Sequence, residues 1–118
     1  MGCCHLLEDG DASVMIDCGM VGEPFFIRRG VRKLGLKPSS IKAVLLTHGH
    51  LDHAGNLPWL KNWSGAKILA HKLEAQHVAG NYPYTGLARW CGRLEAAGRF
   101  LFRRRPGSID ESIEDGQE

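Results

Sequence analysis

The feature that most constrains this sequence is an apolar run that ends directly in a cluster of histidines. Residues 41–47 contain the continuous apolar stretch Ala43-Val44-Leu45-Leu46. Such a run, without polar alternation, is typical of a strand that is buried on both faces of a parallel sheet. The next six residues, 48–53, read His-Gly-His-Leu-Asp-His. The sequence therefore predicts a buried strand over 41–47, with a mostly polar loop over 48–53 at its carboxyl end.

The rest of the chain predicts alternating strands and helices, and hence the α/β class. Asp9-Gly10 between two short apolar runs is a hairpin signal. Phe25, Val31 and Leu34 are expected to form the apolar side of a first helix. The predicted elements are strands at 4–7, 13–16, 41–47 and 66–70, and helices at 23–34, 54–63 (with a break at Pro58), 72–78 and 85–102.

Composition narrows the class of protein. The chain has 118 residues, which is enough for one domain, and its 43% hydrophobic content excludes a disordered chain. A formal net charge of +2 gives no argument for nucleic acid as a partner. The sequence has no apolar run of the roughly 20 residues that cross a bilayer, no signal-peptide pattern and no C-x-x-C pair. We expect a cytoplasmic protein with reduced thiols that acts on a small molecule, with no membrane contact and an oligomeric state left open.

The histidine cluster predicts a metal site. His48, His50, Asp52 and His53 place three imidazoles and a carboxylate within six residues. These are ligands that zinc accepts, and iron and manganese accept them as well. His48 and His50 point to the same side of an extended segment, whereas Asp52 and His53 are adjacent and converge poorly with them on one ion. Two neighbouring ions, most simply zinc, are therefore expected.

The segment resembles the H-x-H-x-D-H signature of the metallo-β-lactamase superfamily. Residues 14–19, Val-Met-Ile-Asp-Cys-Gly, resemble that family's strand-ending segment, and 54–58 and 68–71 resemble the segments after its metal loop. The resemblance implies an αββα sandwich of two mixed sheets with helices outside. It also implies hydrolysis by a metal-bound hydroxide.

Carried over residue by residue, the resemblance assigns His48 and His50 to the first metal, and Asp52 and His53 to the second. Asp52 is also the expected catalytic residue, which orients the attacking water. Asp17 is expected to support the metal loop from behind.

The sequence departs from the family pattern after His77. A third metal-ligand histidine in a Gly-His-x-x-Gly context, a bridging aspartate and a final histidine are absent, and residues 108–118 resemble the strand and turn that precede the third histidine. We therefore expect residues 1–118 to be the N-terminal part of one such domain, apparently truncated to its first half, with little activity on its own.

Three functions stay open for the full-length protein. The first is a metal-dependent hydrolase of a thioester or small ester, similar to glyoxalase II. The second is a phosphodiester hydrolase or nuclease of the same superfamily, and the third is a non-catalytic fragment that binds metal.

Several residues outside the motif have two interpretations. The six arginines of residues 89–105 form either a solvated helix face or a patch for an anionic substrate. His71 is expected to be structural and His77 to be a surface residue. The aromatic side chains are expected in the core, and the alternative is that they line a substrate pocket; they are Trp59, Trp63, Tyr82, Tyr84 and Trp90.

Overall fold

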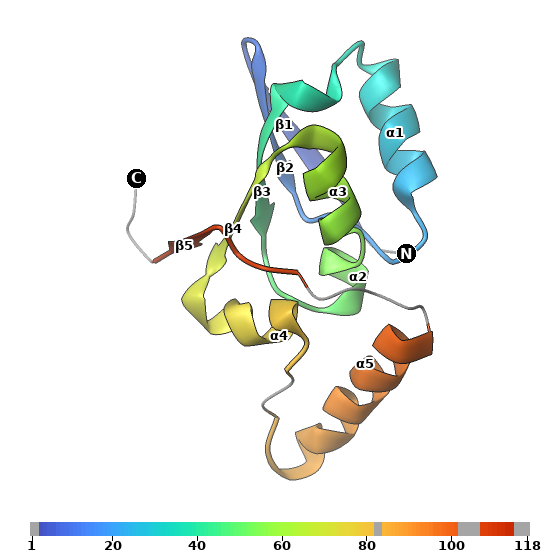
Figure 1. Cartoon of the computed structure of the whole chain (residues 1–118), viewed down its shortest axis with the longest axis vertical. Helices are drawn as coiled ribbons and strands as arrows, with labels where there is room; N and C mark the ends of the chain where they lie inside the picture. Colours follow the sequence, from blue (N-terminus) through green and yellow to red (C-terminus); the bar gives the residue numbers. More distant parts are fainter. Residues whose placement is uncertain (1–2, 82–83, 102–106, 115–118) are drawn as a thin grey trace.

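A computed structural model describes residues 3–81, 84–101 and 107–114. Its centre is one five-stranded sheet in the order β1-β2-β3-β4-β5 (Figure 1). The strands are β1 His5–Asp9, β2 Ala12–Ile16, β3 Ile41–Leu46, β4 Lys67–His71 and β5 Glu111–Ile113. β1 is antiparallel to β2, and every other neighbouring pair is parallel. The predicted strands are confirmed, and the three-residue β5 lies within the C-terminal segment that was expected to hold a strand.

The β1–β2 hairpin forms where the Asp-Gly signal predicts it. Asp9 pairs with Ala12 across a two-residue turn of Gly10 and Asp11. Gly10 has a φ of +56°, a conformation that costs glycine little and that most other residues avoid. The turn therefore sets the register that places Leu6 opposite Met15.

The helices connect the parallel strands in chain order. The elements are α1 Pro24–Lys33, η1 Pro38–Ser40, α2 Leu51–Ala54, α3 Leu57–Ser64, η2 Lys72–Glu74, α4 Ala75–Ala79, η3 Gly86–Ala88 and α5 Arg89–Leu101. α1 links β2 to β3, α2 and α3 link β3 to β4, and α4 and α5 link β4 to β5. The helices predicted over 23–34, 72–78 and 85–102 are confirmed, although the last residue of the third, Phe102, lies outside the described residues.

Two predictions about helices need correction. The loop over 48–53 is shorter than predicted, because α2 already begins at Leu51. Pro58 does not interrupt a helix; it lies in the first turn of α3, where its missing N–H costs no hydrogen bond. The gap between α2 and α3 is fixed instead by Gly55, where an added Cβ would lie 2.4 Å from the backbone nitrogen of Val21.

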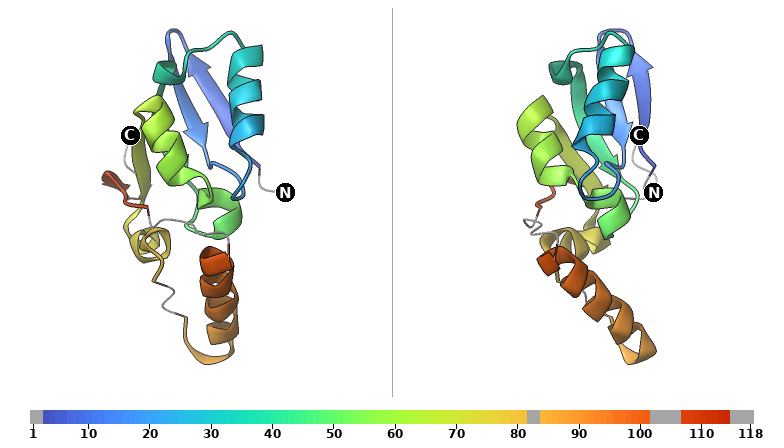
Figure 2. Two further views of the ribbon diagram at one scale, coloured as in Figure 1. Left: turned by 45° about the vertical axis from the view of Figure 1, so that its right-hand side comes forward. Right: turned by 90° about the vertical axis from the view of Figure 1, so that its right-hand side faces the viewer.

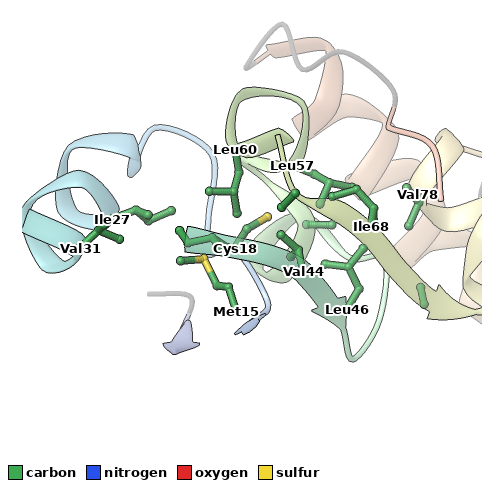
Figure 3. Close-up of a cluster of buried hydrophobic side chains, with 14 residues drawn as sticks. Met15, Cys18, Ile27, Val31, Val44, Leu46, Leu57, Leu60, Ile68 and Val78 are labelled. Atoms are coloured by element: carbon green, nitrogen blue, oxygen red, sulfur yellow. The ribbon is translucent and has the colours of Figure 1, made fainter. Parts of the chain in front are cut away.

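The hydrophobic core lies between the sheet and the two helices α1 and α3. Ile27 and Val31 from α1 and Leu57 and Leu60 from α3 join one buried cluster with strand residues such as Val44 (Figure 3). Figure 2 shows these helices on the same side of the sheet. α1 is rotated relative to the prediction: Ile27 and Val31 face the core, whereas Phe25 is 64% and Leu34 is 56% exposed.

The opposite face of the sheet is less covered. Ile16 pairs with Leu45 and Leu45 with Leu69, and all three side chains are only half-buried. Successive strand residues alternate between faces, so these side chains form an apolar row on the face that α1 and α3 do not cover. Among the described residues, no helix has the length and apolar character needed to cross a membrane.

The carboxyl ends of the parallel strands position the candidate site. β2, β3 and β4 run side by side in the same direction, so the segments that follow Ile16, Leu46 and His71 leave the sheet at one edge. That edge is where open α/β sheets place their functional residues. α5 lies beyond it, next to α2 and α4 (Figures 1 and 2).

Candidate metal centre

The metal loop, residues Thr47 to His53, connects β3 to α2 and includes its first turn. His50 is the N-cap of α2, and its backbone is still extended, with a φ of −71° and a ψ of 162°. Its carbonyl accepts the N–H groups of His53, at 3.1 Å, and Ala54, at 2.8 Å. Asp52 and His53 therefore lie in a helical turn, where residues three positions apart share one side. This turn folds the second half of the motif back towards the first.

The four predicted ligands come together. Ligand atoms of His48, His50 and Asp52 all lie within 4.8 Å of one another. The His53 ring is 3.8 Å from the His48 ring, and its Nε2 is 3.3 Å from Asp52 Oδ2. The argument that Asp52 converges poorly with His48 and His50 is thus wrong, because it did not foresee the helical turn, while the same argument for His53 stays a prediction. How the four ligands divide between two ions stays a prediction.

Asp17 connects the end of β2 to the metal loop. Its Oδ1 accepts the backbone N–H of Thr47, and its Oδ2 accepts the Thr47 hydroxyl, both at 2.8 Å. Oδ2 also lies 2.8 Å from His53 Nδ1. Only 7% of the Asp17 side chain is exposed, and its φ is +58°, in the left-handed region that aspartate tolerates. Asp17 thus lies behind the loop as expected, while its effect on metal binding stays a prediction.

These contacts determine which ring nitrogens are available to a metal. An ionised Asp17 favours a proton on His53 Nδ1, which leaves Nε2 with its lone pair. The Thr47 hydroxyl has one proton and donates it to Asp17, so Thr47 can only accept from His48 Nδ1, at 3.0 Å. Both His48 and His53 therefore present Nε2 as a ligand.

Electrostatics also favours the neutral, metal-binding form of His48. Partial burial, followed by the neighbouring rings of His53 and His50, lowers the pKa of His48 below its usual range. A neutral imidazole is the form that binds a metal ion, so this ring does not need to lose a proton at neutral pH before it ligates.

Glu74 and His77 reach the metal loop from the end of β4, and neither was predicted to do so. Glu74 Oε2 accepts the backbone N–H of Gly49 at 2.8 Å and lies 3.6 Å from His77 Nδ1. The His77 ring is 5.8 Å from the His50 ring, and only 15% of its side chain is exposed. The prediction of a surface residue is wrong, because His77 and Val78 of α4 pack against Gly49. Gly49 has no room for a side chain there, since an added Cβ would lie 2.6 Å from His77 Cβ.

Tyr84 and Glu95 both contact the ring of His50. The Tyr84 hydroxyl is 2.6 Å from His50 Nε2, and Glu95 Oε1 is 3.6 Å from His50 Nδ1. Of the aromatic residues considered as pocket lining, Tyr84 is therefore at the site. Trp59 and Trp63 instead stack on each other at 5.0 Å and pack against the core, and Tyr82 lies outside the described residues.

His71 has the structural position that was expected. Its Nδ1 accepts the backbone N–H of Leu73 at 3.3 Å and so caps η2. The predicted alternation of strands and helices was the signal that could have found Glu74 and His77, because it makes β3 and β4 parallel and brings their carboxyl ends together. No such signal pointed to Tyr84 and Glu95, since both lie in the long connection after β4.

The donor set fits a divalent transition metal. Imidazole nitrogens and a carboxylate oxygen within 4.8 Å of one another are ligands that zinc takes in proteins, and iron and manganese accept the same atoms. Asp17 behind His53 supplies the second hydrogen bond that metal-ligating histidines generally have.

Comparison with known proteins gives relatives that are named for different activities. Ribonuclease TTHA0252 of Thermus thermophilus is 46% identical over 59 residues, which are 50% of this chain and 14% of that protein. The probable metallo-hydrolase YybB of Bacillus subtilis is 35% identical over 79 residues, 66% of this chain and 34% of that protein. The chain therefore spans about a third or less of the length of these relatives.

Solved structures agree on the fold. A metallo-beta-lactamase of Cronobacter sakazakii with a mutated HARLDQ motif is 31% identical with a TM-score of 0.77, covering 95% of this chain and 40% of that one. BJP-1, a subclass B3 metallo-beta-lactamase of Bradyrhizobium japonicum, is 25% identical with a TM-score of 0.76, covering 97% and 39%. The predicted fold is thus confirmed for the part that the chain spans. The family model described as the metallo-beta-lactamase superfamily matches residues 1–118, and the chain belongs to that superfamily of metallo-hydrolases.

Proposed function

We propose that this chain carries the metal-binding half of a zinc hydrolase that acts on a thioester or small ester. The observation that carries the proposal is the convergence of His48, His50 and Asp52 within 4.8 Å at the carboxyl edge of the sheet. We propose two zinc ions, with His48 and His50 on the first and Asp52 and His53 on the second. Bound metal would supply Lewis-acid activation of water and of the scissile carbonyl.

The chain's own side chains have separate roles in this proposal. Asp17 holds His53 through Nδ1, and Thr47 holds His48 through Nδ1, so that Nε2 of both rings stays available to a metal. Asp52 has 49% of its side chain exposed, so its carboxylate is accessible to water and substrate. We assign Asp52 the role of orienting the attacking water, because a carboxylate oxygen accepts a hydrogen bond from water and fixes its lone pair.

The small-molecule substrate and the cytoplasmic location are part of the proposal. The four cysteines Cys3, Cys4, Cys18 and Cys91 are free thiols, which supports a reducing compartment. A thioester is the substrate that the resemblance to glyoxalase II favours. The name of the Bacillus subtilis relative, a probable metallo-hydrolase, supports hydrolysis in general.

A second candidate is hydrolysis of a phosphodiester. Two observations favour it: the Thermus thermophilus relative is named a ribonuclease, and α5 carries Arg89, Arg93 and Arg99. A phosphodiester carries a negative charge at the reacting group, so arginines beside the metal loop would attract it.

The experiment loads the full-length protein, of which residues 1–118 are the expected N-terminal part, with zinc and compares two substrates, S-lactoylglutathione and bis-p-nitrophenyl phosphate. Metal content is measured on the same samples. His48→Ala removes a proposed ligand, and His5→Ala on the exposed β1 strand is the matched control. We expect thioester cleavage that His48→Ala abolishes and His5→Ala leaves unchanged. Cleavage of the phosphodiester alone would favour the second candidate. Bound zinc without either activity would overturn both and favour a non-catalytic metal-binding protein.

A further inference from the structure

A depression lies between Tyr84 and the first turns of α5, and Tyr84 contacts His50 of the metal loop. It has a volume of about 490 Å³ and is lined by Gly80, Asn81, Tyr84, Arg89, Gly92, Arg93 and Ala96. None of these lining residues is acidic, so the two arginines set the charge of the depression. We propose that Arg89 and Arg93 bind an anionic group of the substrate, a phosphate or a carboxylate, while the scissile bond lies at the metal loop. This inference rests on the proposed hydrolase function and names the chemistry of its substrate.

Tyr84 joins the depression to the metal loop. Its side chain belongs to the lining, and its hydroxyl is 2.6 Å from His50 Nε2. A molecule in the depression would therefore lie against the residue that contacts a proposed ligand. Tyr84 thus contacts both the arginine-lined depression and His50.

The two arginines are placed to act together. Arg89 and Arg93 lie one helical turn apart on α5, and residues four apart share one face of a helix. The Arg93 guanidinium lies 5.3 Å from the centre of the Trp90 ring, a cation–π contact that limits its freedom. Two guanidinium groups on one wall offer the parallel N–H donors that bind phosphate and carboxylate oxygens in pairs.

Their charges are not neutralised within the described part of the chain. There, the ion pairs of basic residues with carboxylates involve Lys61, Lys67 and Lys72, and the histidines, but not Arg89 or Arg93. Arg99 on the same helix differs, because it donates to the backbone carbonyls of His77 and Val78 and so holds α5 against α4. Of the two interpretations of the arginine-rich helix, the patch for an anionic substrate is the one that we propose for Arg89 and Arg93. Arg103 to Arg105, which the sequence also placed in it, lie outside the described residues.

A second basic depression provides a comparison. Arg28, Arg29 and Arg32 line a hollow on α1, so positive charge alone does not single out the α5 site. α1 and α5 lie at opposite ends of the molecule (Figure 1). The α5 depression is distinguished by its contact with the metal loop through Tyr84.

The first test measures binding without relying on catalysis. Phenyl phosphate and benzoate are titrated into the protein with and without zinc, followed by NMR signals of the arginine Nε–H and Trp90 indole groups, with benzyl alcohol as the neutral analogue. We expect Arg89→Gln with Arg93→Gln to weaken binding of the preferred anion about 10-fold or more. Arg29→Gln with Arg32→Gln makes the same charge change on α1 and should alter binding less than about 2-fold. The stronger of the two anions identifies the group as phosphate or carboxylate. Equal weakening by this α1 double variant, or equal affinity for benzyl alcohol, would overturn the proposal.

The second test asks whether the site serves catalysis. For an anionic substrate we expect the double variant to raise KM about 10-fold with little change in kcat, because the lost contact is made equally in the ground state and the transition state. For neutral p-nitrophenyl acetate both constants should stay near the wild-type values. An equal loss on both substrates would contradict the inference. Absence of turnover in the zinc-loaded full-length wild type would reject the proposed function, while the binding titration would still decide whether the anion site exists.

Discussion

The Glu74 side chain contacts the backbone of the metal loop at Gly49, between two proposed ligands. It accepts the Gly49 N–H at 2.8 Å, and Gly49 separates His48 from His50. We expect Glu74→Ala to weaken zinc binding about 10-fold, the lower end of what loss of a supporting hydrogen bond costs a metal site. Glu74→Gln should stay close to the wild type, because its amide oxygen still accepts that N–H. Zinc affinity is measured by competition with a chelating dye.

The control for Glu74 is Glu8→Ala on the exposed hairpin, which makes the same side-chain change away from the loop. An equal loss in Glu74→Gln and Glu74→Ala would mean that the negative charge matters, and the hydrogen bond would not be the cause. Unchanged affinity in both variants would show that the metal loop holds its shape without Glu74.

Asp17 determines the orientation of His53 and is expected to matter more. Asp17→Asn retains the left-handed backbone, which asparagine also tolerates, and one oxygen to accept the Thr47 N–H. Its amide nitrogen cannot accept from the Thr47 hydroxyl and from His53 Nδ1 as Oδ2 does. Zinc affinity should fall about 10- to 100-fold in this variant. Competition titration measures the zinc affinity, with the exposed Asp11→Asn as the control. A change below about 2-fold would refute the supporting role of Asp17, because it lies below the range that such hydrogen-bond partners contribute.

At the scale of elements, the sequence predicts structure well where the cause is local. The Asp9-Gly10 turn, the apolar run of β3 and the proline near the start of α1 each act within a few residues, and each element forms where predicted. The metal ligands could be predicted for the same reason, since all four lie close together within residues 48–53. The α2 turn, which brings Asp52 back towards His48, was missed because residues 48–53 were assigned to a loop on their polar pattern, whereas α2 begins at Leu51.

The rest of the site depends on contacts between residues that are distant in the sequence. His77 was assigned to the surface because nothing within its own helix indicates that Gly49, 28 positions earlier, leaves space for it. Tyr84 and Glu95 reach His50 only through the path of the chain after α4. The same limit applies to α1, where the side that faces the core is set by the sheet and not by the positions of Phe25 and Leu34.

Asp110 helps to attach β5 to the sheet, and its ionisation makes the predicted stability depend on pH. Asp110 Oδ2 accepts the Ile68 N–H at 2.8 Å, and its Oδ1 pairs with Lys61. The hydrogen bond with Lys61 is the main cause that lowers the pKa of Asp110 below its usual range. Because the folded-state pKa is the lower one, the stabilisation is fully present above the unfolded-state pKa of about 3.9 and is lost as the pH falls through the folded-state value.

We therefore expect Asp110→Asn to be less stable than the wild type at pH 7, by about 1 kcal/mol or less because the pair is partly exposed. The difference should shrink towards zero as the pH is lowered through about 4 and below. Urea unfolding of both proteins at several pH values measures it. The neighbouring Glu111→Gln, whose partner Lys67 is 3.7 Å away and well exposed, should show almost no difference. A difference that stays constant down to acid pH would contradict the assignment to the charged form of Asp110.

At the scale of the whole molecule, the metal loop is tied to the ends of three adjacent strands. Asp17 follows β2, the loop itself follows β3, and Glu74 lies just after β4. Metal binding should therefore stabilise the whole sheet and not only the loop. A ligand that binds the native state alone adds about 2.7 kcal/mol to its stability when its concentration is about 100 times the Kd.

For a chain of this length, that stabilisation corresponds to a rise in Tm of about 10 °C or more. We expect zinc to raise the Tm in this way, a chelator to reverse the rise, and His48→Ala with His50→Ala to abolish it, whereas His5→Ala should respond like the wild type. Hydrogen exchange then distinguishes stabilisation of the sheet from ordering of the loop alone. Zinc should slow exchange of the backbone amides of β2, β3 and β4 together, because opening any of these strands breaks a contact to the loop. Protection confined to residues 47–54 would mean that the metal orders its own loop while the sheet unfolds independently of it.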